Sequence, residues 1–223
     1  MMDRRTLESF PVRIPRKLAF RYLGIHEKGR RPRASLLALF EEECTQALDL
    51  MAGRAVMRGS KGGLPGSDRF DAGMPLVVVI CTIGPALEER VRLLSENGES
   101  ARAMVLDAIG SAAAEAGTDQ CNRLICERAA STEYHPDTRS SPGYGTWDIR
   151  DQEAIFRFLH PEDIGVVLTG SCMMVPRKSV SCVVPLQGGK PGSGPGNRCR
   201  ICGMKDCPFR SGGDERMEGD QAP

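Results

Sequence analysis

Two stretches decide how this sequence is interpreted: Arg139-Ser-Ser-Pro-Gly-Tyr144 and Leu168-Thr-Gly-Ser-Cys-Met-Met-Val-Pro-Arg-Lys-Ser-Val-Ser181. In the first, Arg139 offers a planar guanidinium fork for a carboxylate, and Tyr144 offers an aromatic face and a hydroxyl. Gly143 lets backbone approach a ligand without a Cβ in the way. Alone, such a Pro-Gly pair more often marks an ordinary surface turn. The second stretch predicts a strand, a turn and another strand that could form a facing wall across a cleft.

Periodicity outside these stretches predicts a mixture of helices and strands. Apolar residues at three- and four-residue spacing indicate a helix over 34–52, and the β-branched run 75–81 is typical of a strand covered on both faces. Without regular β-α-β alternation, this mixture favours a single α+β domain with a largely antiparallel twisted sheet flanked by helices. The other expected elements are a strand starting at 55–57, a helix opening at 84–85, a helix over 100–128 that Gly117 can interrupt, a short helix after 147 that stops at 160–161, and strands at 164–169 and 179–184.

Composition divides the chain into a folded part and a C-terminal tail. Residues 1–186 carry the periodic patterns, whereas 187–198 is rich in Gly and Pro and is predicted to be a linker. Residues 199–210 hold a Cys-x2-Cys-x4-Cys motif, and the polar residues 211–223 are predicted to be disordered. A flexible tail that contains cysteines should therefore follow one domain.

Charge and hydropathy exclude several classes of protein. The formal net charge is +1, from 30 basic and 29 acidic residues, so no basic excess is present to neutralise nucleic-acid phosphates. No run approaches the roughly 20 apolar residues that span a bilayer. The N-terminus lacks the apolar segment of a secretory signal, and we expect a cytoplasmic protein without a membrane span. Arg177 and Lys178, before the last strand, are expected to be solvated charges.

In order and separation, the two stretches and the helix Leu106–Glu115 resemble the reactivation (activation) domain of cobalamin-dependent methionine synthase. The resemblance covers most of residues 12–184. It implies that the chain binds S-adenosylmethionine, with Arg139 gripping the amino-acid carboxylate and the loop backbone meeting the adenosyl portion. Glu115 would accept hydrogen bonds from the ligand, although a plain surface carboxylate is an equally open interpretation. The ligand-binding residues implied by the resemblance are Glu115, Arg139, Ser141, Gly143 and Tyr144.

The same resemblance implies a function. A stand-alone domain of this kind would support reductive methylation of the oxidised corrinoid of a methionine synthase or related methyltransferase. The partner would hold the cobalamin, because this chain has no Asp-x-His-x-x-Gly motif, and an electron donor protein would be required. Gly170 stands where the family has Glu, and the aromatic strand after Ser-Val-Ser is replaced by the linker. These departures leave open an alternative, a non-enzymatic metal-binding or electron-transfer module that docks on a corrinoid protein.

The nine cysteines do not indicate a disulfide scaffold, because they are odd in number and the chain is long. Cys199, Cys202 and Cys207 are spaced to bind one metal through neighbouring thiolates. The fourth ligand could come from Cys172, Cys182, a cluster-bound substrate or a second chain. Spacing alone does not separate zinc from an iron–sulfur cluster, and three free thiols are the less favoured alternative.

Overall fold

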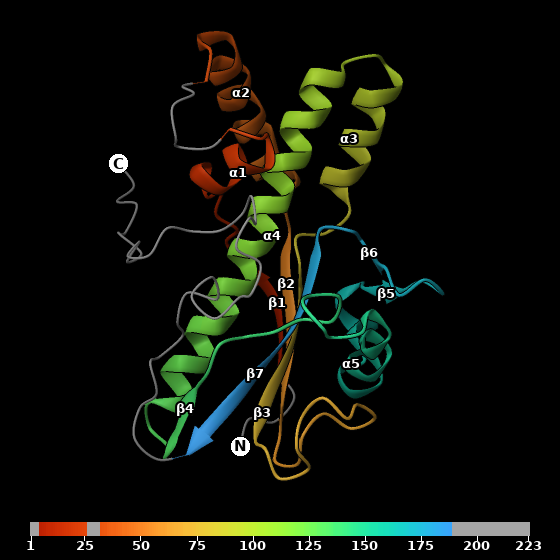
Figure 1. Ribbon diagram of the computed structural model, residues 1–223. Coiled ribbons are helices and arrows are strands. Elements are labelled where there is room, and N and C mark those ends of the chain that lie inside the picture. Colours follow the sequence, from red (N-terminus) through yellow and green to blue (C-terminus); the bar gives the residue numbers. More distant parts are fainter. Residues whose placement is uncertain (1–4, 26–31, 189–223) are drawn as a thin grey trace.

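The computed structural model describes residues 5–25 and 32–188 and is built around a five-stranded sheet. Neighbouring strands pair antiparallel throughout. The predicted α+β class with an antiparallel, twisted sheet flanked by helices is confirmed (Figure 1). In spatial order the strands are β1 (Arg5–Phe10), β2 (Gly53–Ser60), β3 (Leu76–Thr82), β7 (Ser179–Gly188) and β4 (Tyr134–Pro136).

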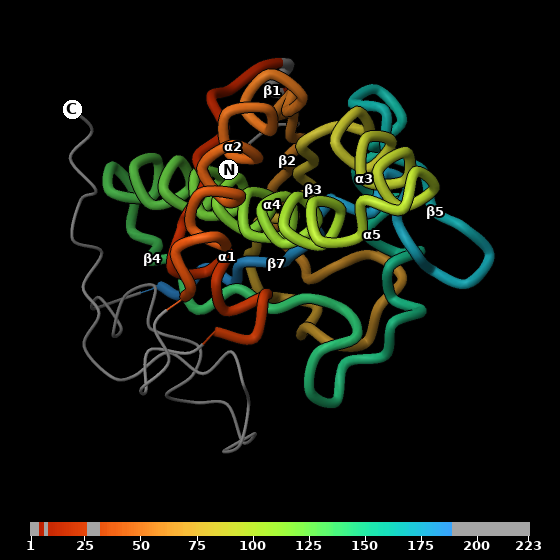
Figure 2. Tube along the Cα trace, turned by 90° about the horizontal axis from the view of Figure 1, so that it is seen from above, coloured from red at the N-terminus to blue at the C-terminus, as the bar shows by residue number. Residues whose placement is uncertain are grey.

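A single long helix, α4 (Ser100–Ala129), covers one face of the sheet and lies across β3 and β7 (Figures 1 and 2). Three more helices pack against it: α1 (Arg16–Tyr22), α2 (Ala34–Leu50) and α3 (Ala86–Glu96). The helices expected at 34–52, after 84–85 and over 100–128 are present. The interruption allowed at Gly117 is absent from α4, since the helix continues through this residue.

The other face of the sheet is covered by shorter elements: η1 (Ile149–Asp151), α5 (Gln152–Leu159) and η2 (Pro161–Ile164). A separate two-stranded sheet, β5 (Val167–Leu168) with β6 (Met174–Val175), lies beside α5 (Figure 1). The strand predicted over 164–169 is therefore mostly wrong: Ile164 ends a 3-10 helix, and only the last part pairs with β6. The strand at 179–184 belongs to the main sheet.

The core lies on both faces of β3, as its unbroken apolar sequence predicted. Every residue of this strand is buried. Val78 and Ile80 contact the cluster under α5, whereas Val77, Val79 and Cys81 contact the cluster under α4. Among the described residues, no helix combines the length and the apolar character needed to cross a membrane.

Candidate functional site

A polar stripe runs along α4. Asp107, Ser111, Glu115 and Asp119 recur every fourth residue, and residues at this spacing share one face of a helix. On the side that packs on the sheet lies Gly117, where a Cβ would be 2.8 Å from Cys81 Sγ, so the missing side chain lets the helix approach β3 closely. The stripe therefore places three carboxylates beside the edge formed by β7 and the chain that follows β4.

Arg139 reaches this stripe because its segment is held against β7. After β4, the amide of Asp137 donates to the Pro185 carbonyl at 2.8 Å. Ser140 and Val183 then exchange two backbone hydrogen bonds of 2.9 and 2.8 Å. The backbone on both sides of Arg139 is thus fixed, and its side chain lies over the α4 face of the sheet.

The Arg139 guanidinium lies between two carboxylates of α4. Its Nη2 donates to Glu115 Oε2 at 3.0 Å, and its Nη1 forms an ion pair of 2.6 Å with Asp119 Oδ1. Only 10% of the Arg139 side chain is exposed. Burial lowers the pKa of Arg139, but the carboxylates of Asp119 and Glu115 outweigh it and raise the pKa overall. The site thus presents a buried cation beside an acceptor for a second cation.

The Ser141–Trp147 turn gives the loop its shape. Gly143 and Gly145 have φ of 84° and 62°, in the left-handed region. The amide of Gly143 donates to the Trp147 carbonyl at 2.9 Å, and Trp147 is buried. Ser141 is also buried, whereas 68% of Tyr144 is exposed. The five residues predicted at the site divide accordingly: Glu115 and Arg139 touch, and the others lie along the loop that continues from Arg139.

The Ser179-Val-Ser181 segment does not face the loop across a cleft, contrary to expectation. The loop instead pairs directly with β7, two residues beyond this segment, through Ser140 and Val183. The Ser181 hydroxyl donates to the Gln152 side chain at 2.7 Å, and the Ser179 hydroxyl donates to Thr82 at 2.9 Å. These hydroxyls are buried, and Gln152 belongs to α5. The Ser181 side chain therefore points to the face of the sheet opposite Arg139.

Lys178 corrects another expectation. It is buried rather than solvated, whereas Arg177 is exposed as predicted. Its ammonium lies 2.8 Å from Asp107 Oδ1 and donates to Ser111 Oγ at 2.8 Å. Sequence reasoning missed these contacts and those of Asp119, although the four-residue spacing along α4 was the signal that could have found them.

The cysteine motif at 199, 202 and 207 lies outside the described residues. Of its suggested fourth ligands, Cys182 is buried with Val184 in the cluster under α4, and Cys172 is buried in the turn between β5 and β6. Within residues 5–25 and 32–188, no three His, Cys, Asp or Glu side chains are grouped to hold a metal ion. Gly170 lies in the same turn as Cys172, and a Cβ there would contact nothing within 4 Å.

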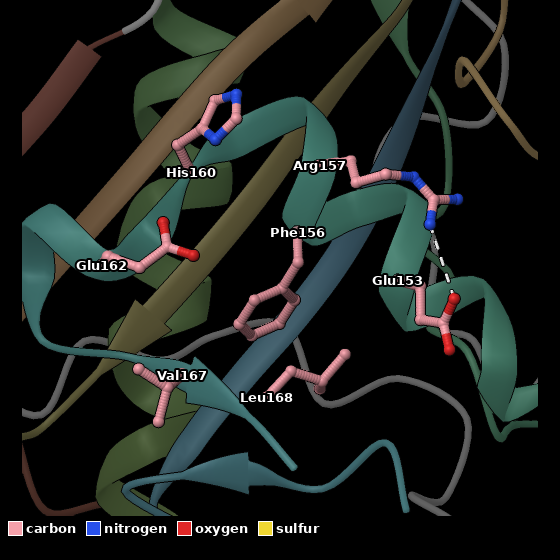
Figure 3. Close-up of a pocket in the computed structure, with 7 residues that line it drawn as sticks. All are labelled: Glu153, Phe156, Arg157, His160, Glu162, Val167 and Leu168. Carbon is pink, nitrogen blue, oxygen red and sulfur yellow. Dashed lines mark hydrogen bonds and ion pairs between the residues drawn. The ribbon is translucent and has the colours of Figure 1, made fainter. Parts of the chain in front are cut away.

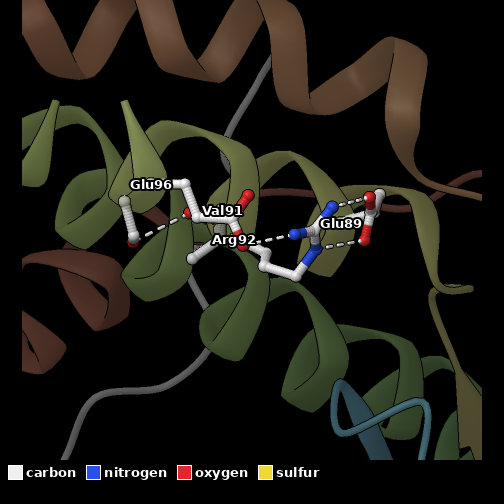
Figure 4. A network of polar contacts seen from close by, with 5 residues as sticks. Glu89, Val91, Arg92 and Glu96 are labelled. Atoms are coloured by element: carbon white, nitrogen blue, oxygen red, sulfur yellow. Dashed lines mark hydrogen bonds and ion pairs between the residues drawn. The ribbon is translucent and has the colours of Figure 1, made fainter. Parts of the chain in front are cut away.

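Two other polar features lie apart from Arg139. A pocket of about 400 Å³ beside α5 is lined by Arg157, His160 and neighbouring side chains of η2 and β5 (Figure 3). On α3, Arg92 pairs with Glu89 at 2.6 Å and with Glu96, and all three side chains are about half exposed (Figure 4). Exposed pairs of this kind contribute little, which sets the buried Arg139 cluster apart.

Comparison with known proteins identifies the class. Residues 75–187, just over half of the 223-residue chain, match the family described as "Vitamin B12 dependent methionine synthase, activation domain". The chain belongs to this family, and the resemblance predicted from the sequence is confirmed. The fold is also that of a solved structure described as the crystal structure of the MetH reactivation domain bound to AdoHcy. That match has a TM-score of 0.66 and 13% identity, and covers 88% of this chain and 82% of that one. No curated protein matches the sequence significantly.

Proposed function

We propose that this protein binds S-adenosylmethionine and supports reductive methylation of the corrinoid of a methionine synthase or a related corrinoid methyltransferase. The observation that carries the proposal is the buried Arg139 guanidinium in contact with Glu115. Family membership supports a corrinoid protein as the partner. A structural neighbour bound to AdoHcy supports the class of ligand.

The residues at the site fit the amino-acid end of this ligand. An α-amino acid presents a carboxylate and an ammonium on one carbon, and Arg139 and Glu115 offer the two opposite charges 3.0 Å apart. Charge-assisted pairs of this type are the stronger hydrogen bonds of proteins. The loop from Ser141 through Gly143 would lie along the adenosyl portion, and the exposed Tyr144 ring is free to stack on it.

The side chains of this protein would bind and orient the methyl donor rather than react with it. The ligand supplies a methyl group on a sulfonium, the partner holds the corrinoid that accepts it, and an electron donor protein supplies the reducing electron. Holding the donor in one orientation removes much of the entropic barrier to transfer. Methylation would also draw off a small reduced population and so pull an unfavourable reduction forward.

We further propose that the tail carries a metal site at Cys199, Cys202 and Cys207, after a linker at 187–198 and before a disordered end at 211–223. A thiolate-rich motif of this spacing suits zinc or an iron–sulfur cluster. An absorption band in the visible range from anaerobically purified protein would identify a cluster. Metal analysis of a colourless protein would identify zinc, and a protein without bound metal would remove this part of the proposal.

Titration calorimetry with S-adenosylmethionine tests the main proposal. We expect binding in the micromolar range, weakened by about 30-fold or more in Arg139→Ala because a charge-assisted contact is lost. Arg157→Ala is a matched control, since Arg157 also pairs with a glutamate, Glu153, but beside the α5 pocket. Loss of binding in Arg157→Ala alone would place the ligand in that pocket. If the wild-type protein releases no heat, the alternative of an electron-transfer module is favoured.

A further inference from the structure

The pairing of one guanidinium with two carboxylates has a consequence for ligand selection. We propose that Asp119 is an exchangeable counter-ion: it pairs with Arg139 in the free protein, and it faces the sulfonium once a ligand carboxylate has replaced it. This inference rests on the proposed function. It makes Asp119 the residue that distinguishes S-adenosylmethionine from its demethylated product, S-adenosylhomocysteine.

Of the two carboxylates that contact Arg139, Asp119 can be displaced from the guanidinium at the lower cost in free energy. Its side chain is 45% exposed, against 21% for Glu115, so water can solvate it after displacement. The Nη2 atom of Arg139 makes a hydrogen bond to Glu115, whereas the buried Nη1 makes no aligned hydrogen bond within the described part of the chain, despite its closeness to Asp119. A ligand carboxylate that approaches Arg139 would therefore replace Asp119 and leave Glu115 to receive the ligand ammonium.

Charge balance then selects the ligand. Arg139 and the two carboxylates that it contacts carry one net negative charge together. The neighbouring Lys178–Asp107 pair adds none. The amino-acid end of either ligand is a neutral zwitterion. The sulfonium of S-adenosylmethionine neutralises the remaining charge, whereas the thioether of S-adenosylhomocysteine leaves it unbalanced.

Distance allows the displaced carboxylate to act on the sulfonium. The sulfur of the ligand is only a few bonds from its carboxylate, and Asp119 already lies 2.6 Å from the Arg139 nitrogen that this carboxylate would take. Opposite charges that are a few ångströms apart at a partly buried site interact strongly enough to change affinity by about tenfold. The product would thus be released more readily than the substrate.

The test is calorimetry with both ligands on the wild-type protein, Asp119→Asn and Asp119→Glu. We expect the wild type to prefer S-adenosylmethionine by about tenfold. Asp119→Asn should bind S-adenosylhomocysteine several-fold more tightly, because the competitor for Arg139 is gone, and the preference should fall close to one. Asp119→Glu keeps the charge and should retain the preference. Glu127→Gln, an equal change of charge at an exposed position two turns further along α4, should leave it unaltered.

The outcomes separate this inference from the proposed function. If the wild type binds the ligand but Asp119→Asn keeps the full preference, Asp119 does not select and the inference fails alone. Equal weakening of both ligands in Asp119→Asn would give Asp119 a purely structural role and also overturn it. If neither ligand binds the wild-type protein, the proposed function is refuted, and the inference is refuted with it. Thermal denaturation of each variant verifies that it is folded.

Discussion

Replacing Gly117 by alanine should destabilise the protein, although alanine is favoured over glycine in a helix by about 1 kcal/mol. The added Cβ would lie 2.8 Å from Cys81 Sγ and 3.4 Å from the ring of Phe10. Cys81 is completely buried in β3, so its sulfur has little room to move. Overpacking of this kind costs about 1–3 kcal/mol. We therefore expect Gly117→Ala to lower the free energy of unfolding by about 1 kcal/mol.

The companion substitution Cys81→Ala shows whether the sulfur is the cause. With Sγ absent, Gly117→Ala should become neutral or stabilise the protein by up to about 1 kcal/mol, the intrinsic preference of the helix. The coupling free energy between the two sites should then be about 1–2 kcal/mol. Urea unfolding followed by circular dichroism measures it. In thermal unfolding, 1 kcal/mol corresponds to about 2–4 °C for a chain of this size.

Ala116→Gly serves as the control, because Ala116 lies on the same turn of α4 but is only partly buried. It should cost about 1 kcal/mol in both backgrounds, reporting helix propensity alone. Ligand binding gives a second measurement, since Glu115 and Asp119 flank Gly117 and would move with the helix. If Gly117→Ala changes stability equally with and without the Cys81 sulfur, the packing explanation is refuted.

Asp107→Ala should destabilise the protein by about 1–2 kcal/mol, because the buried ammonium of Lys178 then lacks its carboxylate. Lys178→Met should destabilise it less, because water can solvate the half-exposed Asp107 that remains. Equal losses of stability for the two variants in thermal denaturation would contradict this. A hydrogen bond from the Arg150 side chain lowers the pKa of Asp148 to about 2. The stability that this pair contributes is therefore fully present above the pKa of about 4 that Asp148 has in the unfolded chain, and it is lost as the pH falls through the pKa of the folded protein. Asp148→Asn should flatten the stability profile over that acid range, and an unchanged slope would refute the assignment. Burial raises the pKa of Cys44 to about 11, so alkylation of this thiol, followed by mass spectrometry, should be slow at pH 8 and accelerate toward pH 11; rapid modification at neutral pH would contradict it.

The local pattern of apolar residues was sufficient to predict the large helices and the central strand. The strand predicted at 75–81 is β3, shifted by one residue, and the helices expected at 34–52 and 100–128 are α2 and α4. These elements bury wide apolar faces, so the spacing of their apolar residues in the sequence shows whether each is a helix or a strand. For α4 the sequence allowed an interruption at Gly117, and the close contact with Cys81 explains this glycine without a break in the helix.

The shortest strands were missed or misplaced, because pairing rather than composition creates them. β1 and β4 lie at the two edges of the sheet, and β4 has only three residues. β5 and β6 have two residues each and pair only with each other. Strands this short contain too little alternation to be recognised, and their existence depends on partners that are distant in the sequence.

The sequence by itself determined that this is an α+β domain and which segments form its core. It also predicted that Arg139 and Glu115 lie together, through a family resemblance that the comparisons confirmed over residues 75–187. Tertiary structure alone decided what surrounds these residues. It gave Arg139 a second carboxylate from Asp119, buried Lys178 beside Asp107, and directed Ser181 to the opposite face of the sheet. Contacts between side chains that are 20 or more residues apart in the sequence depend on how the helices cross the strands. Helical periodicity specifies which residues share a face of α4, but not which strand lies beneath that face.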